Sequence, residues 1–263
     1  MTKNNESLMS FLQINNLTQR FGGLTAVQDF TFDLQQGVLP GLIGPNGAGK
    51  TTIFNIVCGF YHPTIGKITF ENQSIVGKRP NKITRLGIAR TFQNIRLWSE
   101  MSVLDNLCIS QHANLGYGLW DAILRTSRYQ TKERDVHQTA MNLLEKMNLQ
   151  DHAQNRPKNL PYGIQRRVEI ARALATQPRL LLLDEPAAGM NSKEVEHLIE
   201  LIAWIRKEFD ITIWLIEHDM RVVMNVCERI IVLDFGQIIA DGPPESIQND
   251  PKVIKAYLGN IEE

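Results

Sequence analysis

The sequence lacks any apolar run long enough to cross a membrane as a helix. Its longest predominantly apolar stretches, residues 180–183 and 211–216, fall far short of the about 20 residues that a span needs. Residues 1–10 are polar and lack the apolar core of a secretion signal. We therefore expect a cytoplasmic chain, which would act at a membrane only through a partner.

The chain also has no net charge and little cysteine. Lys and Arg number 28, as do Asp and Glu, so no overall field attracts nucleic acid or an anionic membrane. The 3 cysteines, Cys58, Cys108 and Cys227, lack metal-ligand spacing, which indicates buried thiols in a reducing compartment. The 263 residues, 43% apolar and 21% charged, are typical of one large globular domain or of a core with an inserted lobe.

One glycine-rich stretch organises the rest of the chain. It consists of Gly44, Pro45, Asn46, Gly47, Ala48, Gly49, Lys50 and Thr51, and Thr52 follows it. Two glycines separated by four residues and followed by Lys and Thr fit the phosphate-binding loop pattern. Residues 38–43 predict a buried strand before it and residues 52–58 a helix after it, a context that a chance glycine-rich turn would lack. Loop and helix N-terminus together form an anion site. Lys50 brings charge to the β- and γ-phosphates, and the Thr51 hydroxyl is placed to ligate Mg²⁺.

Two strands are predicted ahead of this loop. Apolar residues alternate in residues 11–18 and 27–34, which suits half-buried antiparallel strands. Phe21 lies between them beside two glycines. An aromatic ring there either stacks on an adenine base or plugs the core, and the residues alone leave both possibilities open.

A mostly helical lobe is predicted in the middle of the chain. Apolar positions follow a helical period in residues 102–111 and 132–147, and residues 162–176 form the last helix, whereas residues 115–129 resist assignment. We expect one domain, 1–263, in which this lobe, about 94–177, interrupts an α/β core of about 11–93 and 178–263, with a loose tail at 1–10.

Carboxylates follow a predicted buried strand. Residues 180–183 are four leucines, and Asp184 and Glu185 come directly after them. Asp184 can hold Mg²⁺ and Glu185 can accept a proton from an attacking water, although Glu185 can also be a surface acid at a strand end. His218, after the strand predicted at 212–216, can reach a γ-phosphate oxygen or serve a structural role.

In order along the chain, these motifs resemble the ATPase subunits of ABC transporters. The resemblance covers nearly the whole chain and is carried by residues 44–51, Gln93, 160–165, 180–185, 187–191 and His218. More closely, residues 88–97, 184–189, 216–220 and 256–259 are similar to the ATP-binding subunits of high-affinity branched-chain amino-acid importers. The resemblance implies a P-loop NTPase core with a mostly parallel sheet, an N-terminal antiparallel β subdomain and an inserted helical subdomain.

The resemblance also implies roles for single residues. Gln93 would sense Mg²⁺ and the attacking water, alongside Glu185 and His218 as catalytic residues, and Thr51 and Asp184 as metal ligands. Phe21 would take the adenine-stacking position. A four-residue signature segment would reach across a head-to-tail dimer and cap the γ-phosphate of ATP on the other subunit: Leu160, Pro161, Tyr162 and Gly163.

The partners implied are transmembrane permease subunits and a second ATPase subunit, a paralogue in preference to a second copy. A substrate-binding protein outside the membrane would act indirectly, and no nucleic acid is expected. The chain would lie peripherally on the cytoplasmic face of the membrane.

Two positions depart from the family pattern. Pro161 stands where the signature carries Ser, and it has neither a hydroxyl nor a backbone N–H to donate. Asn191 stands where the dimer-interface loop carries Asp. The phosphate loop and the acids are intact, so ATP binding is expected in either case.

Other functions fit parts of the pattern. The same machinery serves importers of urea or short amides, and nothing in an ATPase subunit touches the cargo. A non-transport ABC ATPase acting on DNA or ribosomes usually has two cassettes or long coiled coils, and this chain has one cassette and no heptad run. Because Pro161 has no donor for the γ-phosphate, a regulatory subunit that binds ATP and hydrolyses it weakly is a further possibility.

Overall fold

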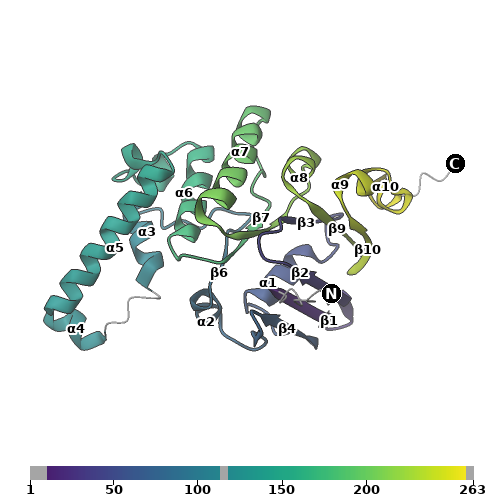
Figure 1. The fold of residues 1–263 in the computed structure, drawn as a ribbon, viewed down its shortest axis with the longest axis horizontal. Helices are drawn as coiled ribbons and strands as arrows, with labels where there is room; N and C mark the ends of the chain where they lie inside the picture. The colour runs from purple at the N-terminus through teal and green to yellow at the C-terminus, as the bar shows by residue number, and fades with distance from the viewer. Residues whose placement is uncertain (1–10, 113–117, 259–263) are drawn as a thin grey trace, which may run out of the picture.

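The computed structural model describes residues 11–112 and 118–258 of the chain (Figure 1). The predicted tail at 1–10, residues 113–117, which include the start of the unassigned stretch, and residues 259–263 lie outside the described part. No helix in the described part is both long and apolar enough to span a bilayer.

Two sheets form the framework. The first is antiparallel, in the order β2-β1-β4-β5, and contains Leu12–Phe21 (β1), Leu24–Leu34 (β2), Ile65–Phe70 (β4) and Gln73–Ser74 (β5). The second has the order β10-β9-β3-β8-β7-β6 and contains Pro40–Ile43 (β3), Ile88–Arg90 (β6), Leu180–Asp184 (β7), Thr212–Ile216 (β8), Arg229–Asp234 (β9) and Gln237–Gly242 (β10). Its strands are parallel except for β10, which pairs antiparallel with β9.

Helices cover the second sheet and extend beyond it. They are Lys50–Val57 (α1), Pro80–Arg85 (α2), Val103–Gln111 (α3), Leu119–Leu124 (α4), Ser127–Lys146 (α5), Tyr162–Leu174 (α6), Ser192–Phe209 (α7), Met220–Val226 (α8), Pro244–Gln248 (α9) and Pro251–Leu258 (α10). Two single 3₁₀ turns, Gln150–His152 and Pro157–Asn159, precede α6. The predicted fold class is therefore confirmed: an α/β core, an antiparallel N-terminal sheet and a helical insertion.

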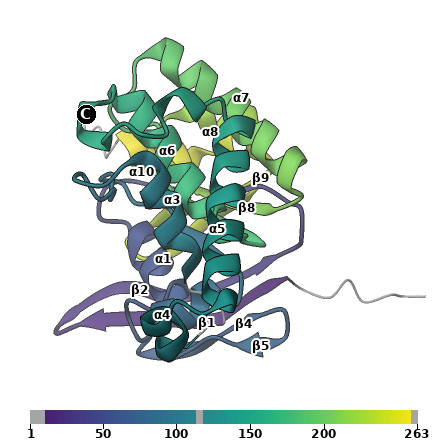
Figure 2. The ribbon, with the colours of Figure 1, turned by 90° about the vertical axis from the view of Figure 1, so that its left-hand side faces the viewer.

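The helical insertion lies at one end of the molecule. In Figure 1, α3, α4 and α5 occupy the left end of the long axis, and α9 and α10 the right end. Figure 2 looks from the helical end and shows α3 and α5 in front of the sheets. The sequence missed the short helices α2 and α8, and α5 begins at Ser127 instead of 132 because the Thr126 side chain caps it by accepting from Tyr129 N.

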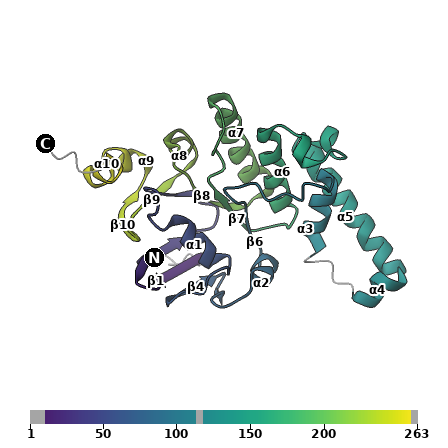
Figure 3. The same cartoon turned by 180° about the vertical axis from the view of Figure 1, so that it is seen from behind.

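Two apolar cores lie on opposite faces of the second sheet. One joins the sheet to α3, α5, α6 and α7. The other core joins the second sheet to α1 and to the antiparallel sheet. Figure 3 shows α1 between the two sheets. At the centre of this core Trp214 is fully buried against Phe32 and Phe54, with ring centroids 4.9 and 5.0 Å away. Cys58 and Cys227 are buried as expected, but Cys108 is only half-buried, because α3 exposes one side.

Replacing Trp214 with Ala should lower the free energy of unfolding by about 3–5 kcal/mol, because it empties a site shared by both sheets. Urea unfolding followed by circular dichroism measures this loss. Trp120→Ala is the matched control, since the Trp120 residue is 73% exposed on α4, and it should change stability by less than about 0.5 kcal/mol. Equal effects at the two positions would contradict the packing described here.

Candidate active site

The glycine-rich loop connects β3 to α1 and requires glycine at two positions. Gly44 has a φ of 147°, and a Cβ there would lie 2.0 Å from the Leu233 carbonyl oxygen. Gly49, at the N-cap of α1, has a φ of 104°, and a Cβ there would lie 2.4 Å from the Ala26 carbonyl oxygen. The loop is thus pressed against both sheets at its two ends.

Between these glycines the loop is open. Asn46 and Gly47 are exposed, as is Thr51 in the first turn of α1, while Thr52 is half-buried. Pro45 is half-buried, and Ala48 is buried. The loop therefore presents its tip and the Thr51 hydroxyl to an incoming ligand.

The Lys50 ammonium is held inside this loop. The residue is 5% exposed, and its Nζ donates to the carbonyl oxygens of Gly44 (2.7 Å) and Pro45 (2.9 Å). Burial lowers the pKa of Lys50, and the Glu185 and Asp184 carboxylates oppose this shift. Among the described residues no carboxylate forms an ion pair with Lys50. Its charge is thus held in place by carbonyls that an anionic ligand can replace.

Asp184 ends β7 beside a buried arginine. Arg90 Nη2 donates to Asp184 Oδ2 (2.6 Å), while Arg90 Nη1 donates to Asn55 Oδ1 (2.7 Å). Oδ1 of Asp184 is buried and has no hydrogen-bond partner in the described part of the chain. Sequence analysis gave Arg90 no role of its own. The sequence feature that could have indicated a role is that Arg90 ends β6, and β6 pairs with β7, the strand that carries Asp184.

Glu185 lies next to both of the other predicted catalytic residues, Gln93 and His218. Its Oε2 accepts a hydrogen bond from Gln93 Nε2 (2.7 Å) and lies 3.7 Å from His218 Nδ1. The backbone of Glu185 is left-handed (φ 47°), an uncommon conformation for a residue with a Cβ. The Glu185 side chain is 11% exposed, whereas that of His218 is 55% exposed. The segments after β6, β7 and β8 thus converge on one carboxylate.

A second acid fixes the backbone around these groups. Glu217 is fully buried and accepts from the backbone N–H groups of Ala187 (2.7 Å), His218 (2.9 Å) and Asp219 (3.2 Å). Burial raises the pKa of the Glu217 carboxyl, and these three donors act in the opposite direction. This structural role of Glu217 was not predicted from the sequence. The feature that could have indicated it is the position of an acid directly after the buried strand β8.

The segment around Gln93 rests on a buried ion pair of α6. Arg166 and Glu169 have fully buried side chains 2.7 Å apart. Arg166 donates to the carbonyl oxygens of Phe92 and Gln93, both at 2.7 Å. Glu169 accepts from the backbone N–H groups of Phe92 and Arg96. This support for Gln93 was not predicted from the sequence. The feature that could have indicated it is a pair of charged residues, Arg166 and Glu169, on the apolar face of α6.

The predicted signature residues lie around the start of α6. Leu160 is buried, Pro161 is the exposed N-cap residue, Tyr162 is exposed and Gly163 is half-buried. Among the described residues no hydrogen bond or ion pair joins this segment to residues 44–52. One chain therefore does not bring its signature segment to its own phosphate loop.

Phe21 ends β1 with an exposed ring. The residue is 43% exposed and makes an edge contact with Tyr61, with ring centroids 5.3 Å apart and an interplanar angle of 75°. An exposed ring is not a core plug, which removes one of the two possibilities that the sequence left open. The exposed part of the ring can contact another planar group.

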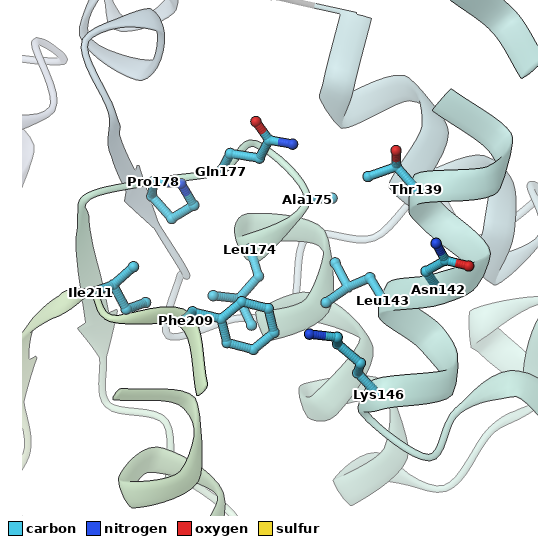
Figure 4. Close-up of a pocket in the computed structure, with 10 residues that line it drawn as sticks. All are labelled: Thr139, Asn142, Leu143, Lys146, Leu174, Ala175, Gln177, Pro178, Phe209 and Ile211. Atoms are coloured by element: carbon cyan, nitrogen blue, oxygen red, sulfur yellow. The ribbon is translucent and has the colours of Figure 1, made fainter. Parts of the chain in front are cut away.

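A cavity of about 430 Å³ lies elsewhere, where α5 meets the core (Figure 4). Its ten lining residues include one cation, Lys146, which already pairs with Glu208. None of the ten is a carboxylate or one of the predicted site residues. This cavity therefore offers no chemistry comparable to that around Glu185.

Comparisons with known proteins agree with this geometry. The family described as "ABC transporter" matches residues 27–188, and that described as "Branched-chain amino acid ATP-binding cassette transporter" matches residues 237–262. The high-affinity branched-chain amino acid transport ATP-binding protein LivG of Salmonella typhimurium is 48% identical over 248 residues, which cover 94% of this chain and 97% of that protein.

Solved structures share the fold. The ADP conformation of MJ1267, an ATP-binding cassette of an ABC transporter, has a TM-score of 0.82 at 31% identity and covers 95% of this chain and 99% of its own. A dimeric post-hydrolysis state of the ATP-binding cassette MJ0796, bound to ADP and Pi, has a TM-score of 0.74 at 25% identity, over 89% of this chain and 98% of its own. The chain belongs to the ABC transporter family, as an ATP-binding cassette.

Proposed function

We propose that this chain is the ATP-hydrolysing subunit of an importer for branched-chain amino acids. It would bind permease subunits at the cytoplasmic face of the membrane. The observation that carries the proposal is the convergence of Gln93 and His218 on Glu185, beside a phosphate loop whose buried lysine is held by carbonyl oxygens. The cargo rests on the names of relatives such as LivG.

In this proposal the nucleotide is bound by its two ends. Adenine stacks on the exposed ring of Phe21, and the phosphates lie against the N–H groups of residues 46–52. Lys50 turns from the carbonyl oxygens of Gly44 and Pro45 to the β- and γ-phosphates, a short movement of a long side chain.

The residues present suit a bound Mg²⁺. Thr51 offers a hydroxyl, Gln93 an amide oxygen, and Asp184 a buried carboxylate oxygen without a partner in the described residues. These are hard oxygen donors of the kind that Mg²⁺ prefers. When bound, the ion would neutralise charge on the β- and γ-phosphates. Arg90 would hold the other oxygen of Asp184 and so orient the first.

Hydrolysis then falls to three side chains. Glu185 accepts the proton of the attacking water, and the Gln93 amide, already 2.7 Å from its carboxylate, orients that water. His218 donates a hydrogen bond to a γ-phosphate oxygen, which its exposure allows. The left-handed backbone at Glu185 supports this role, because uncommon backbone conformations cluster at active sites.

A second ATPase subunit would complete each site. The dimeric structure of the cassette MJ0796 supports pairing of two such subunits. Residues 160–163 of one chain would then cap the γ-phosphate on the other. We propose a paralogous partner and the domain division given above, with a helical lobe at about 94–177. A composite site that uses Pro161 would be the weaker of the two, since Pro161 has no donor for phosphate. Glu185 of this chain would serve the other, stronger site, so unchanged transport after loss of Glu185 alone would contradict this ranking.

Phe21→Ala is expected to weaken ATP binding about tenfold or more, because stacking of a base on an aromatic ring contributes about 1–3 kcal/mol. The dissociation constant of a fluorescent ATP analogue measures this. Leu24→Ala is the control, since Leu24 pairs with Phe21 across the same turn and is 67% exposed. Equal affinities for the Phe21 variant and the unmodified protein would remove Phe21 from the site.

The cargo is tested by uptake in the native cell. Deletion of the chain should abolish uptake of labelled leucine, isoleucine and valine, and Glu185→Gln should not restore it. Loss of urea uptake with unchanged leucine uptake would instead assign the cargo to urea or short amides. If uptake persists with Glu185→Gln, a weakly hydrolysing regulatory subunit, the alternative that Pro161 favours, replaces the proposal.

A further inference from the structure

Tyr162 follows Pro161 and brings a hydroxyl next to the position where the signature serine is missing. Its hydroxyl makes two hydrogen bonds within the chain. It donates to the Ala188 carbonyl oxygen at 2.9 Å and accepts from Arg166 Nη2 at 3.1 Å. The hydroxyl's one proton is therefore engaged within the chain, so it does not replace the serine as a phosphate donor.

The Tyr162 hydroxyl is hydrogen-bonded to an arginine that is itself held in place. The same Nη2 donates to the Gln93 carbonyl oxygen (2.7 Å), and Nη1 donates to Phe92 and to the buried Glu169. Arg166 and Glu169 are both 0% exposed. Two hydrogen bonds therefore lead from the Tyr162 hydroxyl, through one guanidinium nitrogen, to the backbone of Gln93.

The second hydrogen bond of the Tyr162 hydroxyl, to Ala188, connects it to the turn that contains Glu185. Ala188 N donates to the Glu185 carbonyl oxygen at 3.2 Å, so both lie in the same turn after β7. The next residue, Gly189, has a φ of 78°, and its missing Cβ would lie 3.6 Å from the Tyr162 ring. The ring thus packs on the turn that its hydroxyl holds.

We propose that Tyr162 is a positioning residue that joins the signature segment, residues 160–163, to the turn at 185–189 and to Gln93. Capping of the nucleotide on the partner subunit would thereby align this chain's own Glu185 and Gln93. The inference rests on the proposed function, because it assumes that residues 160–163 reach a partner's nucleotide.

The position of Tyr162 predicts a functional effect without a loss of stability. Its residue is 40% exposed, so water can replace the hydroxyl at the Ala188 carbonyl when it is removed. A displacement of about 1 Å at a catalytic group, in contrast, can cost about 10²-fold in rate. Tyr162→Phe keeps the ring on Gly189 and removes both hydrogen bonds. We expect its kcat for ATP to fall about 10- to 100-fold, with KM within about twofold and an unchanged melting temperature.

Hydrogen exchange on the nucleotide-free protein tests the link without any assumption about function. In Tyr162→Phe the amides of residues 187–190 should exchange about threefold to tenfold faster, as the loss of one net hydrogen bond implies. Tyr129→Phe, the same change on α5, is the control and should leave these amides unaffected. Unchanged exchange at 187–190 in Tyr162→Phe would overturn the inference, whatever the activity.

A double-mutant cycle with Pro161→Ser separates positioning from direct phosphate binding. If Tyr162 positions Glu185, Pro161→Ser should change kcat by the same factor in the unmodified protein and in the Tyr162→Phe variant. If Pro161→Ser fully restored the kcat of the Tyr162→Phe variant, the serine and tyrosine hydroxyls would have the same function, and the inference would be overturned. If the unmodified protein hydrolyses no ATP alone or with its partners, the proposed function fails, and the exchange experiment still decides the link.

Discussion

Glu185→Gln should lower ATP turnover at its composite site by about 10³-fold, within the range measured for loss of a positioned general base. An amide cannot accept the proton of the attacking water, yet it has nearly the shape of the carboxylate and keeps an oxygen for the Gln93 amide, which lies 2.7 Å away. ATP binding should survive, because Lys50 and the loop residues are untouched. Phosphate release measures turnover, and a fluorescent ATP analogue measures binding.

The matched control is Glu196→Gln, which makes the same change on the exposed side of α7. It should leave both turnover and binding within about twofold, as surface substitutions usually do. If Glu185→Gln turned over normally in a homodimer of this chain, Glu185 would have no part in the mechanism. The convergence of Gln93 and His218 on it would then be structural.

Lys50→Gln should abolish measurable ATP binding, with a loss of about 100-fold or more in affinity. Charge-assisted hydrogen bonds contribute about 1.5–3 kcal/mol each, and Lys50 would make more than one to the phosphates. Turnover would fall with binding. Isothermal titration calorimetry with ATP, in the presence and absence of Mg²⁺, measures the effect.

The stability of this variant distinguishes a binding defect from a folding defect. Burial lowers the pKa of Lys50, so the folded state disfavours its charged form, and removal of the charge should not reduce the free energy of unfolding near neutral pH. Lys67→Gln is the control, because Lys67 is exposed on β4. If Lys50→Gln bound ATP as tightly as this control, the loop would not be the phosphate site.

Sequence alone predicted the parts of the site that depend on local chain order. Lys50 and Thr51 follow glycines whose spacing sets the loop, and Asp184 and Glu185 follow four buried leucines. Strand, loop and helix are local structures, so their residues could be placed before their surroundings were known. The α/β core with an inserted helical lobe followed from the order of apolar strands and helical segments, whereas the resemblance to ABC transporter ATPases implied the full fold class.

The supporting contacts could not be predicted this way, because they join distant segments. Arg90 reaches Asp184 across 94 positions, and Arg166 reaches Phe92 across 74. Glu217 holds Ala187 from the neighbouring strand. Each is a charged residue in an apolar environment, and only the packed fold shows which backbone groups it satisfies. The link through Tyr162 belongs to the same class.

If this cassette powers transport across a membrane, it should co-purify with the other subunits of a transporter. Mass spectrometry of the proteins that co-purify with the tagged chain, extracted from its native membrane in mild detergent, tests this. We expect two multi-spanning permeases and a second ATPase subunit in stoichiometric amounts. Recovery of ribosomal or DNA-repair proteins without a permease would contradict the transport function and leave only the ATP site.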